Sequence, residues 1–259
     1  MLTKIEKPRS QSFVTAFARG LSVIEAFAGR AEALSLTEIA SRSGVDRAVA
    51  RRSLLTLIEL GYVVTDKKNY RLTPRILRLG YAYLSHSGMD GRLQPFVEAL
   101  ARKIGEACSV SILDGIETVG VAHAPSPIHK MGFLLRPGTR MPAYVMTSGR
   151  VLLAAKTDEE VMAVLRKSDR KAITKATRTS FASLMEAIRT VREAGFATIE
   201  EELEVGLLSI AVPIKNRRGE TVASLNMSSS ASRTTMDHFC ALALPEMRRS
   251  ADDIGAILP

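Results

Sequence analysis

Three arginines lie close together in one short stretch of the sequence, at Arg47, Arg51 and Arg52. On a helix, like charges four residues apart destabilise by roughly 0.2–0.5 kcal/mol, so a bound anion would offset the cost of crowding them. Arginine forms paired hydrogen bonds with O6 and N7 of guanine, and it also binds phosphate oxygens. The cluster therefore indicates a DNA-binding surface; the alternative is that these arginines pair with surface acids such as Asp46 and Glu59.

A second candidate site is the stretch VMTSGRVLLAA, which places Thr147 and Ser148 at the start of a predicted helix. The first N–H groups of a helix have no internal acceptors and carry partial positive charge. Together with the two hydroxyls they could hold a ligand carboxylate, and Gly149 would let the ligand approach closely. The alternative is that Thr147 or Ser148 only caps the helix.

The segment 13–61 has the pattern of three helices that would position the arginines. Apolar residues recur at helical spacing over 13–27. Ser35, followed three residues later by Glu38, is a capping-box pattern for a second helix. Asp46 is a good N-cap for the third helix, which would carry the arginines into the major groove.

Two short β-like runs after the third helix predict a hairpin over 62–73, the wing of a winged helix-turn-helix. Its turn carries Lys67 and Lys68, which suit contact with the backbone of a duplex, although surface ion pairing is the alternative. Arg19, in the first helix, and Arg9, in the N-terminal arm, are further candidates for phosphate or minor-groove contact.

The charge distribution also favours a nucleic-acid module at the N-terminus. The chain has 259 residues and a formal net charge of +9. Residues 1–80 hold 14 Lys and Arg against 7 Asp and Glu, whereas residues 81–259 hold 22 against 20. A basic first third joined to a nearly neutral remainder is typical of a nucleic-acid module attached to another domain, although a solvated basic face is the simpler alternative.

The composition is that of an ordinary soluble globular protein, with 46% hydrophobic and 24% charged residues. No apolar run approaches the roughly 20 residues that span a bilayer, and the N-terminus lacks the pattern of a signal peptide. Cys108 and Cys240 indicate neither a disulfide framework nor a zinc site. We therefore expect a cytoplasmic protein that does not bind a membrane.

The whole pattern predicts three parts: a winged helix-turn-helix DNA-binding domain over 1–73, a linker helix over 74–90 and an effector-binding domain over 91–259. The third part alternates helix and strand patterns, which predicts an α+β fold with an antiparallel sheet flanked by helices. It includes a strand over 129–138 and a closing helix interrupted near Pro245. The apolar side of the linker helix could pair with a second chain.

Five stretches resemble, in the same order, those of the IclR family of bacterial transcription regulators. They are FARGLSVIEAFA, LTEIASRSGVDRAVARRSLLTLIELGYV, GTRMPAYVMTSGRVLLAA, EEELEVGLLSIAVPI and VASLNMSSSASR. The amino-acid sequences of these stretches are most similar to those of the branch that controls protocatechuate, 4-hydroxybenzoate and β-ketoadipate catabolism. The resemblance implies an N-terminal winged helix, a linker helix and a GAF-like effector domain. It also implies dimers that can pair into tetramers, bind near-palindromic promoter DNA and respond to small acids.

The resemblance further implies which residues bind the effector. The pocket positions of the family fall here on Met141, Thr147, Ser148, Ser209, Asn226 and Ser228. Ordinary strand polarity is the alternative for the last three. Arg51 and Ser53 depart from the family pattern, which has an aromatic or aliphatic residue and a leucine there in many members, so the operator sequence cannot be inferred from relatives.

Two further sets of side chains could complete an effector pocket. Met131, Phe133 and Met141 could form an apolar wall for an aromatic ring, although each also fits a plain core position. Arg136 and Arg140 could pair with a second carboxylate.

We expect neither a cofactor nor enzymatic activity. The acidic run of Glu200, Glu201, Glu202 and Glu204 has no histidine at ligand spacing, so a solvated or salt-bridged turn is favoured over a metal site. The sequence lacks a coupled nucleophile, base and metal set, and it has neither a GxSxG elbow nor a phosphate-binding glycine loop.

The preferred prediction is a ligand-responsive regulator of aromatic-acid catabolism genes. It would bind double-stranded promoter DNA as a homodimer or as a tetramer made of two dimers, and its effector would be a small aromatic or dicarboxylic acid. One alternative is an enzyme that converts a small acid and has an incidental basic N-terminal domain. Another is a nucleoid or RNA-binding protein without a ligand.

Overall fold

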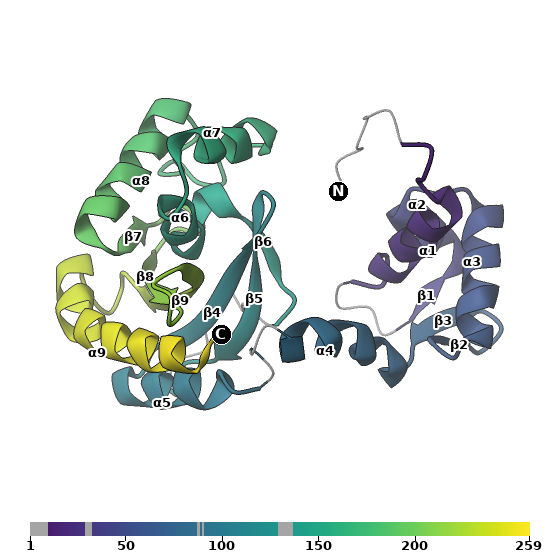
Figure 1. Ribbon diagram of the computed structural model, residues 1–259, viewed down its shortest axis with the longest axis horizontal. Helices are drawn as coiled ribbons and strands as arrows, with labels where there is room; N and C mark the ends of the chain where they lie inside the picture. The colour runs from purple at the N-terminus through teal and green to yellow at the C-terminus, as the bar shows by residue number, and fades with distance from the viewer. Residues whose placement is uncertain (1–9, 29–32, 87–88, 90, 129–136) are drawn as a thin grey trace. The chain divides into compact units, whose positions relative to one another are not determined.

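A computed structural model describes most of the chain, namely residues 10–28, 33–86, 89, 91–128 and 137–259 (Figure 1). The chain separates into two compact units, Met1–Tyr83 and Leu84–Pro259. None of the described helices combines the length and the apolar character that crossing a bilayer demands.

The N-terminal unit is a winged helix-turn-helix with a three-stranded antiparallel sheet in the order β1-β3-β2. Its helices are α1 (Thr15–Glu25), α2 (Leu36–Ser43) and α3 (Arg47–Glu59), and its strands are β1 (Leu34–Ser35), β2 (Val63–Thr65) and β3 (Asn69–Leu72). The three predicted helices and the hairpin are confirmed. The two residues of β1 were not predicted, because so short a strand shows no alternation.

Capping groups in the sequence explain where α2 and α3 begin and end. Ser35 and Glu38 form the predicted capping box: Ser35 Oγ accepts from the Glu38 N–H at 3.3 Å, and Glu38 Oε2 accepts from the Ser35 N–H at 2.8 Å. Gly44 ends α2 with a φ of 67°, a left-handed conformation that glycine adopts without strain. Asp46 Oδ1 then accepts from the Val49 N–H at 2.8 Å, so Asp46 caps α3, which begins three residues after Gly44.

A fourth helix, α4 (Leu77–His86), follows a single 3-10 turn over Pro74–Ile76 and spans the boundary between the two units in the sequence. None of its residues is buried in the single chain. Four of its large apolar side chains are exposed, namely Leu77, Leu79, Tyr81 and Tyr83. Exposed apolar surface gathered on one helix is typical of a contact with another protein chain.

The C-terminal unit is built on a six-stranded antiparallel sheet in the order β6-β5-β4-β9-β8-β7. The strands are β4 (Ala107–Asp114), β5 (Glu117–Ala124), β6 (Arg140–Pro142), β7 (Ala197–Glu200), β8 (Leu207–Lys215) and β9 (Thr221–Ser230). The helices are α5 (Gln94–Ile104), α6 (Thr147–Ala154), α7 (Asp158–Lys167), α8 (Phe181–Ala194) and α9 (Met236–Ile257). In Figure 1, α5 and α9 lie on one side of the sheet and α6 on the other. The predicted α+β class is confirmed.

The two faces of this sheet differ in chemistry. One face packs on α5 and α9 through apolar residues such as Val110 and Ile112 of β4 and Leu225 and Met227 of β9. The alternate positions of the central strands face α6 and include six polar residues: Ser109, Ser111, Ser209, Ser224, Asn226 and Ser228. We call this side of the sheet the serine face.

Two helices differ from what the sequence predicted. The predicted interruption near Pro245 is wrong, because α9 is continuous through that residue. Phe239 before the proline and Met247 after it are buried in one core, so packing offsets the hydrogen bond that proline removes. α7 was missed altogether, although Thr157 and Glu160 form a capping box at its start.

Some predicted features fall outside the described residues. They are the candidate DNA contact Arg9, the candidate pocket residues Met131, Phe133 and Arg136, and most of the strand expected over 129–138. The described chain resumes in a turn at 137–138, which leads into β6.

Candidate DNA-binding and effector-binding sites

α3 presents the three predicted arginines to solvent. Arg47, Arg51 and Arg52 are exposed, whereas Val49 and Leu54 on the same helix are buried in the core of the N-terminal unit. The ion pairs formed among the described residues include none of the three arginines. No described acid neutralises them, so their charge is available to an external anion.

Arg19 and Arg52 line a groove between α1 and α3. The groove has a volume of about 470 Å³, and its walls include the exposed apolar side chains of Phe17 and Leu21. Arg52 lies about 100° further round α3 than the residue before it, because an α-helix has 3.6 residues per turn. The four arginines therefore form two sets. Arg19 and Arg52 lie at the groove, and Arg47 and Arg51 lie one turn apart elsewhere on α3.

The turn between β2 and β3 presents Lys67 and Lys68 at an exposed tip. Asp66 shapes this turn, because its Oδ1 accepts from the backbone N–H groups of Asn69 at 2.8 Å and Lys68 at 3.0 Å. These hydrogen bonds favour the carboxylate and hold the pKa of Asp66 below its ordinary value. Lys67 has a φ of 80°, which is uncommon for a residue with a side chain. A tightly defined turn with two cations suits contact with a phosphate backbone.

Asn226 is the centre of a buried polar network on the serine face. Its Nδ2 donates to Thr147 Oγ1 at 2.6 Å and to the carbonyl of Ile210 at 3.2 Å. Its Oδ1 accepts from Ser228 Oγ at 3.3 Å and from Ser109 Oγ at 3.5 Å. One side chain thereby ties the first residue of α6 to three strands.

Four predicted effector residues, Thr147, Ser209, Asn226 and Ser228, belong to this network, because the hydroxyls of Ser209 and Ser228 lie 3.0 Å apart. Ser109 joins them and was not predicted. It stands opposite Asn226 in the β4–β9 register. The alternation of serine with apolar residues in CSVSILD is the signal that could have identified it.

The N-terminal end of α6 has no side-chain cap. Its N-cap residue is Met146, and both Thr147 and Ser148 lie inside the helix, so neither of them is the cap. The two side chains are 1% and 0% exposed. Ser148 Oγ has no hydrogen-bond partner within the described part of the chain. Free N–H groups beside a buried, unpartnered hydroxyl are donors that a carboxylate can accept from.

Gly149 meets the backbone of a neighbouring turn rather than an open site. A Cβ at this position would lie 2.0 Å from the carbonyl oxygen of Ala143. The glycine is thus needed for α6 to pack against the 3-10 turn Ala143–Val145, which corrects the expectation that it makes room for a ligand.

The two candidates on β6 have other contacts. Met141 is half-buried and packs against the small core formed by α6, α7 and α8. Arg140 is paired with Glu117 at 2.8 Å and with Asp114 at 2.7 Å. Its charge is therefore already neutralised by two carboxylates of the hairpin between β4 and β5.

The acidic run contains a buried ion pair, which confirms the predicted salt-bridged turn. Glu202 binds the guanidinium of Arg150, a residue of α6 that was not predicted to matter. The backbone N–H of Arg178 donates to Glu202 Oε2 at 2.9 Å, and Arg150 Nε donates to the carbonyl of Tyr144 at 3.2 Å. Among the described residues, no three His, Cys, Asp or Glu side chains are grouped to hold a metal ion.

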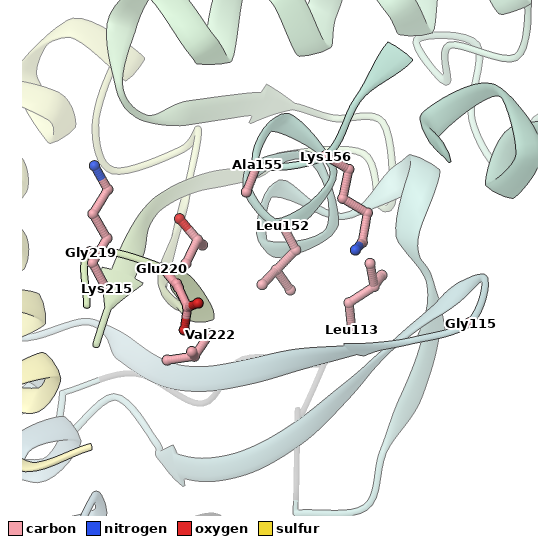
Figure 2. A pocket seen from close by; sticks show the side chains of 10 residues that line it. Leu113, Gly115, Leu152, Ala155, Lys156, Lys215, Gly219, Glu220 and Val222 are labelled. Carbon is pink, nitrogen blue, oxygen red and sulfur yellow. The ribbon is translucent and has the colours of Figure 1, made fainter. Parts of the chain in front are cut away.

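A cavity of about 860 Å³ opens at the C-terminal end of α6 (Figure 2). Leu113, Leu152 and Val222 supply apolar walls, and Lys156 and Lys215 supply positive charge. None of the predicted effector residues lines it. The polar network and this cavity thus lie at the two ends of one short helix.

Comparison with protein families gives matches over both units. A family described as "IclR helix-turn-helix domain" matches residues 16–67. A second, described as "Bacterial transcriptional regulator IclR C-terminal", matches residues 81–256. The matched ranges contain α3 and the whole polar network.

Two relatives are similar over most of their length. The Pca regulon regulatory protein of Pseudomonas putida is 37% identical over 242 residues, which cover 93% of this chain and 83% of the relative. The p-hydroxybenzoate hydroxylase transcriptional activator of Acinetobacter baylyi is 32% identical over 253 residues, which cover 96% of this chain and 93% of the relative.

Solved structures share the fold. A protein from a Rhodococcus species, described as a transcriptional regulator, is 42% identical with a TM-score of 0.81, over 95% of this chain and 98% of that one. An IclR homologue from Microbacterium hydrocarbonoxydans, solved with 4-hydroxybenzoate, has a TM-score of 0.81 at 21% identity. The similarity covers 94% of this chain and 99% of that homologue. At that identity the similarity concerns the fold alone.

Proposed function

Because the chain belongs to the IclR family of bacterial transcription regulators, we propose that it controls genes of aromatic-acid catabolism and that a small aromatic or dicarboxylic acid is its effector. The family membership supplies the regulator function. Similarity to two relatives whose names refer to the Pca regulon and to p-hydroxybenzoate hydroxylase supports the aromatic branch.

The observation that carries the effector proposal is the bond from Asn226 to Thr147 at the uncapped end of α6. The carboxylate of the effector accepts from the first N–H groups of α6 and from the hydroxyl of Ser148, and the partial positive charge of the helix end stabilises it. The hydroxyls of Ser209 and Ser228 can both donate and accept, so they suit a second polar group on the effector.

α3 and the hairpin between β2 and β3 bind the DNA. Arg47 and Arg51 lie one turn apart on α3 and read base edges in the major groove. Lys67 and Lys68 contact the phosphate backbone from the turn, and their charge supplies affinity rather than sequence discrimination.

The regulator acts as a homodimer. The exposed apolar side chains of α4, among them Leu77 and Leu79, are covered by a second chain. Two-fold symmetry then presents two copies of α3 to two half-sites, which matches a near-palindromic operator. The effector changes operator affinity because it binds more tightly to one arrangement of the assembly than to the other.

Fluorescence anisotropy tests the proposal with labelled DNA from upstream of the gene of the protein, in the presence of excess random duplex. Protocatechuate, 4-hydroxybenzoate, β-ketoadipate and muconate are added one at a time. We expect specific binding that one acid strengthens or weakens. Specific binding that none of the four acids alters would contradict the assignment to aromatic-acid catabolism. If the upstream DNA binds no better than random duplex, and a genome-wide binding assay also finds no preferred site, the regulator function would be contradicted.

A paired measurement separates the two sites. The Asn226→Ala variant should keep its operator affinity in the absence of effector and lose the response to the acid. The Arg47→Ala variant should bind the acid normally and lose specific operator binding. A variant pair in which each change abolished both activities would indicate misfolding, which circular dichroism of each sample would detect.

A further inference from the structure

The cavity at the C-terminal end of α6 has the chemistry of a ligand site. Its volume of about 860 Å³ lies within the range of roughly 300–1,000 Å³ that small-molecule pockets occupy. Leu113, Leu152 and Val222 form its apolar walls. Figure 2 shows the amine of Lys156 turned toward Leu113. Apolar walls with a few polar groups at fixed places are typical of pockets that bind small organic molecules.

This cavity is separate from the candidate effector site at the other end of α6. On the same face of the sheet, Leu113 and Val222 each lie two residues from a serine of their own strand, Ser111 and Ser224. These two serines stand opposite each other in the β4–β9 register, and both are buried. The serine pair lies between the cavity walls and Asn226, so the cavity and the polar network are two sites and not one continuous pocket.

Hydrogen bonds define the rim of the cavity at the turn between β8 and β9. Asn216 Oδ1 accepts from the backbone N–H groups of Arg218 and Glu220, both at 3.0 Å. Asn216 Nδ2 donates to Glu220 Oε2 at 2.9 Å, which also holds the side chain of this lining residue. The rim is therefore formed before a ligand binds, and little conformational entropy is lost in ordering it.

The charges in the lining favour an anion on the side of Lys156. Figure 2 places Lys215 and Glu220 together on one side of the cavity and Lys156 on the other. The Lys156 amine lies 4.0 Å from a carboxylate oxygen of Glu160, and both side chains are partly exposed, so this ion pair is weak. One side of the cavity is thus positive, and the other carries both signs of charge.

The end of α6 does not oppose an anion here. The C-terminal end of a helix carries partial negative charge on carbonyl groups that lack a donor. Arg192 supplies donors at this end, since its Nε donates to the Ala154 carbonyl at 3.0 Å and its Nη2 to the Lys156 carbonyl at 2.7 Å. The same hydrogen bonds fix the backbone that carries the Lys156 amine.

We propose that this cavity binds an organic acid, distinct from the effector at the other end of α6. Its apolar body packs against the three apolar walls, and its carboxylate accepts from the amine of Lys156. Lys215 and Glu220 together offer a donor and an acceptor, which suit a hydroxyl or amide group at the far end of the ligand.

Disulfide trapping in the full-length chain tests the proposal. Ala155→Cys places a thiol in the cavity lining, at an exposed position beside Lys156. Two probes are each equilibrated with the variant and mercaptoethanol: an aromatic disulfide that ends in a carboxylate, and the same molecule with a primary amide in its place. The mass of the intact protein gives the fraction captured. Burial raises the pKa of both native thiols, Cys108 and Cys240, so they react little, and the unaltered chain measures that background.

We expect the Ala155→Cys variant to capture the carboxylate probe roughly threefold to fivefold more than the amide probe, the range of a partly exposed ion pair. Adding Lys156→Gln should remove this preference. Adding Lys167→Gln is the matched control, because Lys167 is an exposed cation of α7 outside the cavity lining, and the preference should remain. Ser232→Cys, at an exposed turn after β9, should capture both probes equally.

The proposal is overturned if the Ala155→Cys variant captures both probes equally, or if the preference survives Lys156→Gln. The same preference at Ser232→Cys would also overturn it, because the probes themselves would then differ in reactivity. Operator DNA takes no part in this measurement, so its outcome is independent of the regulator function.

Discussion

Arg150 and Glu202 meet as a two-pronged ion pair inside the C-terminal unit, with Nη1 2.8 Å from Oε1 and Nη2 2.6 Å from Oε2. Their side chains are 2% and 6% exposed. Arg150 belongs to the same helix as Thr147, so the pair anchors the helix end that carries the candidate effector site to the turn between β7 and β8.

Glu202→Gln should lower the free energy of unfolding by about 3–5 kcal/mol, because it leaves the buried guanidinium of Arg150 without a countercharge. Urea unfolding followed by circular dichroism measures the change. The control is Glu117→Gln, which breaks an exposed pair with Arg140 and should cost at most about 1 kcal/mol. Equal losses of unfolding free energy in the two variants would mean that burial of the Arg150–Glu202 pair does not contribute to stability.

Asn226→Ala should weaken binding of the effector by roughly tenfold to a hundredfold, because a lost partner of a buried polar group costs about 1–3 kcal/mol. The change frees Thr147 Oγ1 and removes the link between α6 and the serine face. Calorimetric titration with the acid that alters operator binding measures it. Ser232→Ala, at an exposed turn after β9, should leave the affinity unchanged.

Removal of the α3 and hairpin cations should affect DNA binding in different ways. Arg47→Ala and Arg51→Ala should each reduce discrimination against the wrong base by about 1–3 kcal/mol. Lys67→Ala and Lys68→Ala should each weaken all duplexes alike and lower the slope of log affinity against log salt by about 0.9. Anisotropy at several salt concentrations separates these effects, and Arg102→Ala on α5 serves as the control.

Gly149→Ala should destabilise the chain by about 1–3 kcal/mol or more, because the added methyl would overlap the Ala143 carbonyl and force α6 away from its neighbour. Thermal unfolding compares it with Gly20→Ala in α1, where a Cβ meets no atom within 4 Å. That control should stabilise by up to about 1 kcal/mol, since alanine favours a helix over glycine. A neutral Gly149→Ala would show that the backbone relaxes at this contact.

The capping box at the start of α7 predicts an acid-sensitive element. Hydrogen bonds from the Thr157 N–H and hydroxyl hold the pKa of Glu160 below its ordinary value. A carboxyl whose pKa is lower in the folded state stabilises the fold above its ordinary pKa, and this contribution is lost as the pH falls through the lowered one. Glu160→Gln should therefore flatten the decline of stability in acid. Urea unfolding at a series of acid pH values tests this, and Glu159→Gln should keep the original profile.

The N-terminal unit could be predicted from the sequence because its signals are local. Ser35 with Glu38, Gly44 and Asp46 fix the ends of two helices within a few residues, and the periodic apolar side chains fix their inner faces. The grouping of Thr147, Ser209 and Asn226 came from resemblance to a family, and the structure shows how strand alternation brings them together.

Other features depend on contacts between distant parts of the chain, which no local pattern reveals. Arg150 and Glu202 are 52 residues apart, and nothing near Arg150 in the sequence predicts its partner. The role of Gly149 likewise depends on how α6 meets the Ala143 turn. At Pro245 the local rule predicted a break, but the shared core on both sides of the proline outweighs it.

The serine face has a consequence for how the C-terminal unit opens. Burial of hydroxyls contributes less hydrophobic free energy than burial of methyl groups, so the end of α6 over the serine face gains less from burial than α5 and α9 gain on the opposite face. Backbone amides of α6 should therefore exchange with deuterium through local opening, whereas those of β4 and β9 should exchange only through global unfolding. A ligand bound at the uncapped end of α6 would slow that exchange. Occupancy of the site would then be measurable as reduced mobility of this one helix.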